Sequence, residues 1–510
     1  MVGRPASRLK FSDVFAAEWT LEETEASGAR SGGTPRRALA AAAIAAVFCV
    51  AASVALWGFT VDDALITCRY AHNIASGHGY TFNPGSPATD GVTPLGLPYL
   101  LAPFARSSAL SALAAAKVMG IVAHMLAAGF VVYAVARTTT KRSAFAGCVA
   151  WLVSAPAVAW SASGLETPIA ECLVAAGASL RLLGKREPLG IVLLGLAAGM
   201  RPELMPLAAT LGAPHPNDGT TPRVGAPTFA RLGIVVAPFL VVAIVRVVLF
   251  GRPAPLSAVA KPADVTLGLM YAGACLLLAG AVGLVAPWAL RRADRFTRWL
   301  VAAFVVHAAA VAFAGGDWMP VSRLFVPALP VLALAVAGVA EHARPVWTWV
   351  RCVLALAGVA QAWSSVGEKL VRVQGDREAV IEQMRGPLAE SRVIAALDIG
   401  WLGAVAPDAT IVDPAGVTDP EIAVLPGGHL RKKIPDGLLK ARGTDTIVLQ
   451  LFKEYPVADP WTESTFARGI EIYVAKEPGL GDAFEPAFVS TGRLRYLVVK
   501  RRAAGALPQP

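Results

Sequence analysis

The stretch ALAAAAIAAVFCVAASVALWGF, residues 38–59, carries no charged side chain. At about 1.5 Å per residue, an α-helix of this length crosses the hydrocarbon core of a bilayer. A second uncharged stretch, residues 265–290, is longer still. A buried helix of a soluble protein would be shorter and would show a polar stripe on one face. Both stretches therefore predict helices that span a membrane.

The composition of the whole chain agrees with this prediction. Of 510 residues, 55% are hydrophobic and only 16% are charged, too few charges to cover the surface of a soluble protein of this size. The formal net charge of +10 would suggest nucleic acid as a partner of a soluble chain. Here most Arg and Lys residues fall in short connections between apolar stretches, as membrane topology requires. We therefore expect a lipid bilayer, and no nucleic acid, as a partner.

The predicted fold class is an α-helical polytopic membrane protein of about 11 transmembrane helices with a C-terminal soluble α/β domain. With a cytoplasmic N-terminus, the inner connections hold more Arg and Lys than the outer ones, so the positive-inside rule puts the C-terminal domain outside. The spans are expected at residues 38–59, 112–136, 142–161, 165–184, 187–200, 203–213, 231–250, 265–290, 298–315, 322–340 and 345–364.

Three regions follow from these spans. Residues 1–37 are expected to be a disordered cytoplasmic tail, residues 38–366 a transmembrane domain with an outer loop at 60–111, and residues 367–510 an extracytoplasmic α/β domain. Segment 94–105 is short and rich in proline, so it should not cross the membrane, and Pro202 should break its helix. Short β-branched runs predict strands within 391–402, 410–413, 445–451, 470–474 and 495–500.

Asp62 and Asp63 open the outer loop directly after the first span. Two adjacent carboxylates at the lip of a membrane helix raise each other's pKa, which suits a general base or a site for a cation. Alternatively, the pair is an interfacial cap whose carboxylates face water. The rest of the loop favours a site, because turn residues there alternate with hydrogen-bonding side chains, among them His72, Asn73, Asn83 and Asp90.

Basic side chains recur on the same predicted side of the membrane: Arg201 at the helix break, Lys261 in a loop, and Arg323. Each could simply extend to the lipid headgroups or form an ion pair. Together they suggest a site for an anionic lipid headgroup beside a base. Glu166 begins a span, where it either faces the outer cavity or is a first-turn acid favoured by the helix dipole.

The six cysteines show neither a disulfide framework nor a metal-binding spacing.

These residues resemble the first outer loop of the GT-C glycosyltransferases, membrane enzymes that use polyprenyl-phosphate sugars. The pattern is most like that of the actinobacterial terminal arabinofuranosyltransferases and their unassigned bacterial relatives. Three positions depart from it: Cys68 replaces an aromatic residue or Leu, Asp90 replaces Glu, and Leu256 stands where Asn is expected. The segments that carry the resemblance are 62–73, 77–85, 90–95, 163–168, 201–203, 251–261, 315–319 with Arg323, 398–403 and 413–419.

The resemblance implies an inverting transfer of a sugar from a polyprenyl-phosphate donor to a hydroxyl of a glycan, lipid or protein acceptor at the outer face of the bacterial inner membrane. Asp62 or Asp63 would be the catalytic base, with Asp62 the expected one, and Arg69, Arg201 and Lys261 would bind the donor phosphate. No cofactor is required, although some relatives bind a divalent cation at the carboxylates. Substrate contacts are expected from His72, Asn73, Asn83, Asp90, Glu166, Glu203, Asp317, Trp318 and Arg323.

Two other classes of function remain as alternatives. A secondary transporter should show ionisable residues deep in the bundle and a two-fold hydropathy repeat. No such repeat is visible in the sequence, and the candidate charges gather at one face. A non-catalytic polyprenyl-lipid-binding or assembly protein could share the fold, although it would have no need of an intact aspartate pair.

The predicted topology can be tested with an impermeant thiol reagent on intact or outer-membrane-permeabilised cells. Cysteine at Lys433, in the C-terminal domain, should react, and cysteine at Arg142, in an inner connection, should not. The unaltered chain, with its six native cysteines, gives the background. Protection of the cysteine at position 433 would mean that the number of spans is even, contrary to the prediction.

Overall fold

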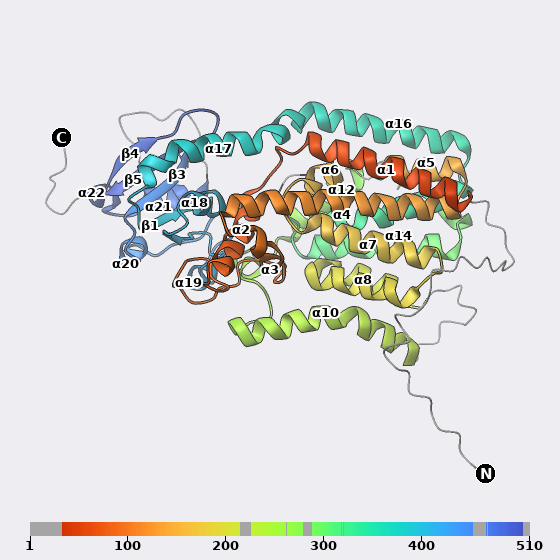
Figure 1. The fold of residues 1–510 in the computed structure, drawn as a ribbon, viewed down its shortest axis with the longest axis horizontal. Coiled ribbons are helices and arrows are strands. Elements are labelled where there is room, and N and C mark those ends of the chain that lie inside the picture. Colours follow the sequence, from red (N-terminus) through yellow and green to blue (C-terminus); the bar gives the residue numbers. More distant parts are fainter. Residues whose placement is uncertain are drawn as a thin grey trace, which may run out of the picture. The chain divides into compact units, whose positions relative to one another are not determined.

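The computed structural model describes residues 33–152, 154–214, 226–261, 263–278, 288–317, 319, 321–451, 466 and 468–502. These residues are mostly helical and end in a small β-sheet (Figure 1). At this level the predicted fold class is confirmed: apolar helices suited to a membrane are followed by C-terminal α/β elements.

Six helices of the described chain are long and apolar enough to cross a membrane. In the most apolar part of α10 only 11% of the residues are buried inside the protein, and so large an exposed apolar surface requires lipid. The first helix begins at Pro35 rather than at residue 38, because proline suits the first turn. The six are α1 (Pro35–Ala55), α4 (Ala109–Thr138), α10 (Ala226–Phe250), α14 (Arg295–Phe313), α15 (Leu329–His342) with the short η4 (Arg323–Ala328) before it, and the helix from Pro345 to Leu388.

Four of the five other predicted spans correspond to shorter helices, and the fifth, 265–290, lies partly outside the described residues, so helix length alone does not establish eleven crossings. Proline explains two of the interruptions. Pro156 starts a new helix inside the expected span 142–161, and Pro202 follows extended Arg201, the break predicted from sequence. These helices are α5 (Lys141–Leu152), α6 (Ala155–Ser161), α7 (Thr167–Leu182), α8 (Glu187–Met200), η3 (Pro202–Leu204), α9 (Met205–Gly212) and α12 (Val265–Leu278).

The outer loop 60–111 is built around α2 (Asp62–Ala75), whose first turn holds both aspartates. Segment 94–105 forms only α3 (Leu97–Leu101) and the 3₁₀ turn η2 (Ala102–Phe104), so it does not cross the membrane, as expected. Helix α2 packs against α4 of the bundle and against α18 (Ile399–Val405) of the C-terminal region. It therefore joins the two parts.

No linker separates the bundle from the C-terminal region. α16 (Pro345–Ala362) continues through a π-helical turn, η5 (Trp363–Gly367), into α17 (Glu368–Leu388), so the expected boundary after residue 366 lies inside a continuous helix. In the wider turn the Trp363 ring packs on Gly367, where a Cβ would lie 2.3 Å from ring atom Cε3. Gly367 thus allows the turn to close.

The C-terminal sheet has the strand order β2-β1-β3-β5-β4. β1 (Val393–Ala396) pairs in parallel with β2 (Thr410–Val412) and with β3 (Thr446–Leu451). β5 (Arg495–Arg501) is antiparallel to β3 and to β4 (Phe484–Val489). The remaining short helices are α11 (Leu256–Ala260), α19 (Pro420–Ala423), α20 (Leu438–Ala441), α21 (Gly469–Ala475) and α22 (Leu480–Ala483).

One strand prediction needs correction. The expected strand 470–474 is wrong, because these residues form α21, in which Ile470 and Val474, four residues apart, turn one face to the core. The strand expected within 391–402 is β1, and α18 begins at Ile399. β4 was not predicted, and its largely exposed residues lack the alternation by which strands are recognised.

Candidate active site

A cavity of about 710 Å³ lies where the outer loop meets the bundle. α2 contributes Asp63 and Thr67, and α10 contributes an apolar wall that includes Phe239 and Val242. Val417, from the C-terminal region, also lines it. The sequence-predicted residues that line the cavity are Asp63, Glu166, Glu203, Lys261, Asp317 and Arg323, drawn from distant parts of the chain.

Asp62 and Asp63 have different surroundings. Successive residues of a helix point about 100° apart, so the first turn of α2 directs the two carboxylates to different sides. Asp63 lines the cavity and its side chain is 29% exposed. The cavity does not include Asp62, which sequence analysis favoured as the base. The geometry supports Asp63 instead.

The Asp62 carboxylate faces the C-terminal region. Oδ2 accepts a hydrogen bond from the Gly400 N–H and Oδ1 from the Trp401 N–H, both at 2.9 Å. The backbones approach so closely that a Cβ at Gly400 would lie 2.1 Å from the Asp62 carbonyl oxygen. Burial, and next the negative charge of Asp398, raise the pKa of Asp62 to about 7.

A network of charged groups lies behind Asp62. The Asp398 carboxylate accepts hydrogen bonds from Arg377 at 2.7 Å, from Arg468 at 2.9 and 3.1 Å, and from the Tyr496 hydroxyl. Burial alone would raise the pKa of Asp398, but the two guanidinium groups outweigh it and hold this pKa well below its usual range. Asp398 therefore stays ionised and ties α17, α18 and the sheet together.

Two of the cations that line the cavity come from distant parts of the chain. Lys261 Nζ lies 4.0 Å from Asp63 Oδ2, and Arg323 Nε lies 2.9 Å from Asp317 Oδ2. The Lys261 and Arg323 side chains are 25% and 14% exposed, so both can meet a ligand. An anionic group bound between them would lie beside the Asp63 carboxylate.

Arg201 is already engaged. Its guanidinium lies 2.5 Å from Glu166 Oε1 and 2.5 Å from Glu203 Oε1, and its side chain is 2% exposed. Two carboxylates offset its charge, and they, rather than Arg201, line the cavity. This arrangement favours Arg201 as the residue that holds Glu166 and Glu203 in place, and Lys261 and Arg323 as the ligands of a phosphate.

Arg69 also lies away from the cavity. It donates hydrogen bonds to the carbonyl oxygens of Phe82, Gly403, Ala406 and Ala409, at 2.5–3.2 Å. These bonds fasten the outer loop to the C-terminal region and occupy the guanidinium that sequence analysis assigned to the donor phosphate. The site derived from the structure accordingly omits Arg69.

Three polar residues were expected to contact the substrate. In the structure they form hydrogen bonds with backbone groups instead. His72 Nδ1 lies 2.7 Å from the Ala105 carbonyl, and Asn73 donates to the carbonyls of residues 81 and 82. Asn83 exchanges two hydrogen bonds of 2.9 Å with the backbone of Ile411 in β2. These side chains shape the outer loop and dock it, and none of them lines the cavity.

Asp90 belongs to an ion pair that the sequence did not reveal. Its Oδ2 lies 2.7 Å from Nε of Arg246, a residue of the lipid-facing helix α10. Arg246 also donates to the carbonyls of Val92 and Thr93 and lines the cavity. A lone arginine within an otherwise uncharged apolar stretch was the available signal, because such residues usually face a partner or a cavity.

Trp318, a predicted substrate contact, lies outside the described residues. Within the described ranges, no three His, Cys, Asp or Glu side chains come close enough together to hold a metal ion. The carboxylates of the cavity are instead paired with Lys261, Arg201 and Arg323. A divalent cation would thus have no ready-made set of protein ligands there.

Comparison of the chain with protein-family models, with curated proteins and with solved structures finds no match.

The raised pKa of Asp62 predicts a pH-dependent stability. Because its pKa is about 7 in the folded protein and 3.8 ordinarily, the folded state binds this proton more tightly. That stabilisation is complete below about pH 4 and is lost as the pH rises through 7. The side chain of the Asp62→Asn variant cannot ionise. We therefore subtract the melting temperature of the variant from that of the unaltered protein, and this difference should decrease as the pH rises from 5 to 8. For Asp436→Asn, at an exposed position, the difference should stay flat, and a flat Asp62→Asn difference would contradict the assignment.

Proposed function

We propose that this chain is a membrane glycosyltransferase of the GT-C type. It would move a sugar, with inversion, from a polyprenyl-phosphate donor to a hydroxyl of an envelope glycan, lipid or protein acceptor at the outer face of the bacterial inner membrane. The observation that carries the proposal is the cavity in which the Asp63 carboxylate lies 4.0 Å from Lys261, with Arg323 on the same lining.

The charges of the cavity suit a sugar phosphate. A base is needed at the acceptor hydroxyl, and cations are needed where negative charge develops on the departing phosphate. Asp63 meets the first requirement, and Lys261 and Arg323 meet the second. Glu166, Glu203 and Asp317 supply acceptors for the hydroxyl groups of a sugar.

The transfer would proceed in one displacement. Asp63 takes the proton of the acceptor hydroxyl, whose oxygen forms a bond to the anomeric carbon. The bond between that carbon and the phosphate oxygen breaks, and the polyprenyl phosphate leaves with the electron pair. Lys261 and Arg323 hold the phosphate before and after bond cleavage. Asp62 positions the first turn of α2 and takes no proton from the acceptor.

The apolar side of the cavity supports a lipid donor. Phe239, Val242 and Ala243 of α10 line it, and α10 is the least buried of the long apolar helices. A hydrocarbon chain could therefore pass from the bilayer along α10 to a phosphate held at the cations. A soluble sugar nucleotide would have no use for this wall.

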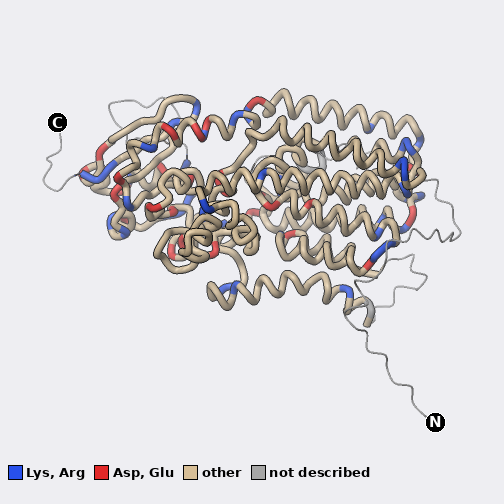
Figure 2. Tube along the Cα trace, in the orientation of Figure 1, with Lys and Arg blue, Asp and Glu red and all other residues tan. Residues whose placement is uncertain are grey.

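The topology belongs to the same proposal: eleven crossings, a cytoplasmic N-terminus and an extracytoplasmic C-terminal region. Lys and Arg gather at the end of the bundle where α15 ends and α16 begins (Figure 2). An excess of basic residues is typical of the cytoplasmic side. The cavity would then open on the outer side, where polyprenyl-phosphate sugars serve as donors.

The lipid-linked sugars of cells with the gene, without it, and with single variants test the proposal. Deletion should accumulate a polyprenyl-phosphate sugar, and Asp63→Asn should reproduce this, with turnover reduced roughly a hundredfold or more. Asp62→Asn should retain more activity than Asp63→Asn, because Asp62 faces the C-terminal region. Asp436→Asn, an exposed control, should behave as the unaltered chain.

Each alternative function has its own signature in this experiment. Full turnover in Asp63→Asn with an unchanged lipid profile would contradict catalysis and favour a lipid-binding assembly protein. Accumulation of a donor on the inner side only would favour a transporter. If Asp62→Asn loses more turnover than Asp63→Asn at equal protein levels, Asp62 and not Asp63 is the base.

A further inference from the structure

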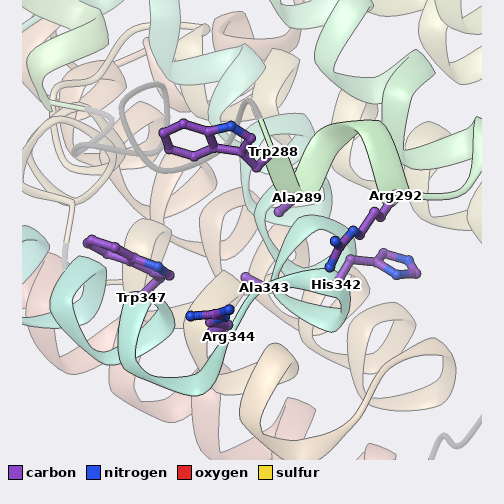
Figure 3. Close-up of a pocket in the computed structure, with 7 residues that line it drawn as sticks. All are labelled: Trp288, Ala289, Arg292, His342, Ala343, Arg344 and Trp347. Carbon is purple, nitrogen blue, oxygen red and sulfur yellow. The ribbon is translucent and has the colours of Figure 1, made fainter.

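A second cavity, of about 340 Å³, lies at the other end of the bundle. It is formed where α15 ends at His342, where α16 begins at Pro345, and beside helical residues 288–292. Figure 3 shows the indoles of Trp288 and Trp347 on one side, with Arg344 below them and with Arg292 and His342 opposite. It shares no lining residue with the cavity that contains Asp63.

All the ionisable side chains that line this second cavity are basic. Arg292, Arg344 and His342 line it, and no acidic side chain does. The nearest acids along the chain have other partners: Glu341 accepts from the backbone N–H of Thr140, and Asp294 caps α14. A bound anion would therefore find cations without a competing carboxylate.

The basic residues of the cavity differ from their neighbours. Arg142 and Arg351 donate to backbone carbonyls of the bundle and so hold helices together. Within the residues that the structure describes, the side chains of Arg292, His342 and Arg344 form neither a hydrogen bond nor an ion pair. Their donors are available for a ligand.

The surroundings point to a lipid as the source of that anion. Trp288 and Trp347 are 74% and 47% exposed, and Val353 and Leu354, further along α16, are also exposed. Tryptophan at the ends of membrane helices lies at the depth of the headgroups, and an exposed apolar helix face beyond it lies against acyl chains. Basic pockets between membrane helices bind anionic headgroups by this combination.

We propose that this cavity binds the phosphate headgroup of an anionic phospholipid of the adjoining leaflet. Arg292 and Arg344 contact the phosphate oxygens, the two indoles flank the glycerol region, and the acyl chains lie along α16. A zwitterionic headgroup binds less well, because its ammonium group meets the same cations. The site is independent of the proposed transfer reaction.

The experiment uses the full-length protein in nanodiscs of phosphatidylcholine with a minor fraction of phosphatidylglycerol. Native mass spectrometry measures how strongly phosphatidylglycerol is enriched among the lipids that stay bound. The double variant Arg292→Gln/Arg344→Gln should lose this enrichment by about tenfold or more. The matched control Arg291→Gln/Arg298→Gln removes two charges from exposed positions outside the cavity and should retain most of it.

Two further variants keep the test decisive if the double variant does not elute as a single species. Arg344→Gln alone should lose part of the enrichment, and Arg344→Lys should keep most of it, because the charge remains. Equal loss in the cavity and control variants would overturn the proposal in favour of a general attraction of basic residues to the membrane. Protection against heat by inorganic phosphate as strong as that by phosphatidylglycerol would overturn it in favour of a soluble anion.

Discussion

The hydrogen bonds from the Gly400 and Trp401 N–H groups to the Asp62 carboxylate fix the first turn of α2 against the C-terminal region. Because helical geometry separates successive side chains by about 100°, this contact also determines where Asp63 points. Asp62 and Asp63 thus have different roles, which the sequence alone does not distinguish. One residue holds the helix, and the other lines the cavity.

Charge compensation determines which cations the cavity can offer to a ligand. Arg201 is bound between Glu166 and Glu203, and Arg246 is bound to Asp90 and two carbonyls. Removing a partner from such a buried pair leaves an uncompensated charge, so these arginines stabilise the cavity wall. Lys261 Nζ lies 4.0 Å from Asp63 Oδ2, beyond ordinary hydrogen-bonding distance, and the Lys261 side chain is 25% exposed.

Sequence patterns predicted the parts of the fold that depend on local chemistry. Long apolar stretches with few charges revealed the long helices, and Pro202 revealed the break. Motifs distant in sequence supplied Glu166, Lys261 and Asp317, which line one cavity. The count of eleven spans went beyond what helix length supports, since hydropathy does not show where α5 ends and α6 begins.

The sequence did not reveal which partner each polar side chain meets. Arg69 and Asn83 were predicted to bind ligands, yet both bond to backbone groups of the C-terminal region, more than three hundred residues along the chain. A side chain's type shows which bonds it can make, whereas the tertiary structure decides which group reaches it. The same reason explains why Asp62 was favoured over Asp63, since both carboxylates have the same intrinsic chemistry.

The affinity of the nanodisc-embedded protein for a polyprenyl phosphate tests the central claim, that Lys261 and Arg323 hold a lipid phosphate beside Asp63. Lys261→Gln should weaken binding by roughly tenfold to a hundredfold, as expected for a lost charge-assisted hydrogen bond. Lys433→Gln, at an exposed position of the C-terminal region, should bind as the unaltered protein does. Equal affinity of Lys261→Gln and the unaltered protein would contradict the claim.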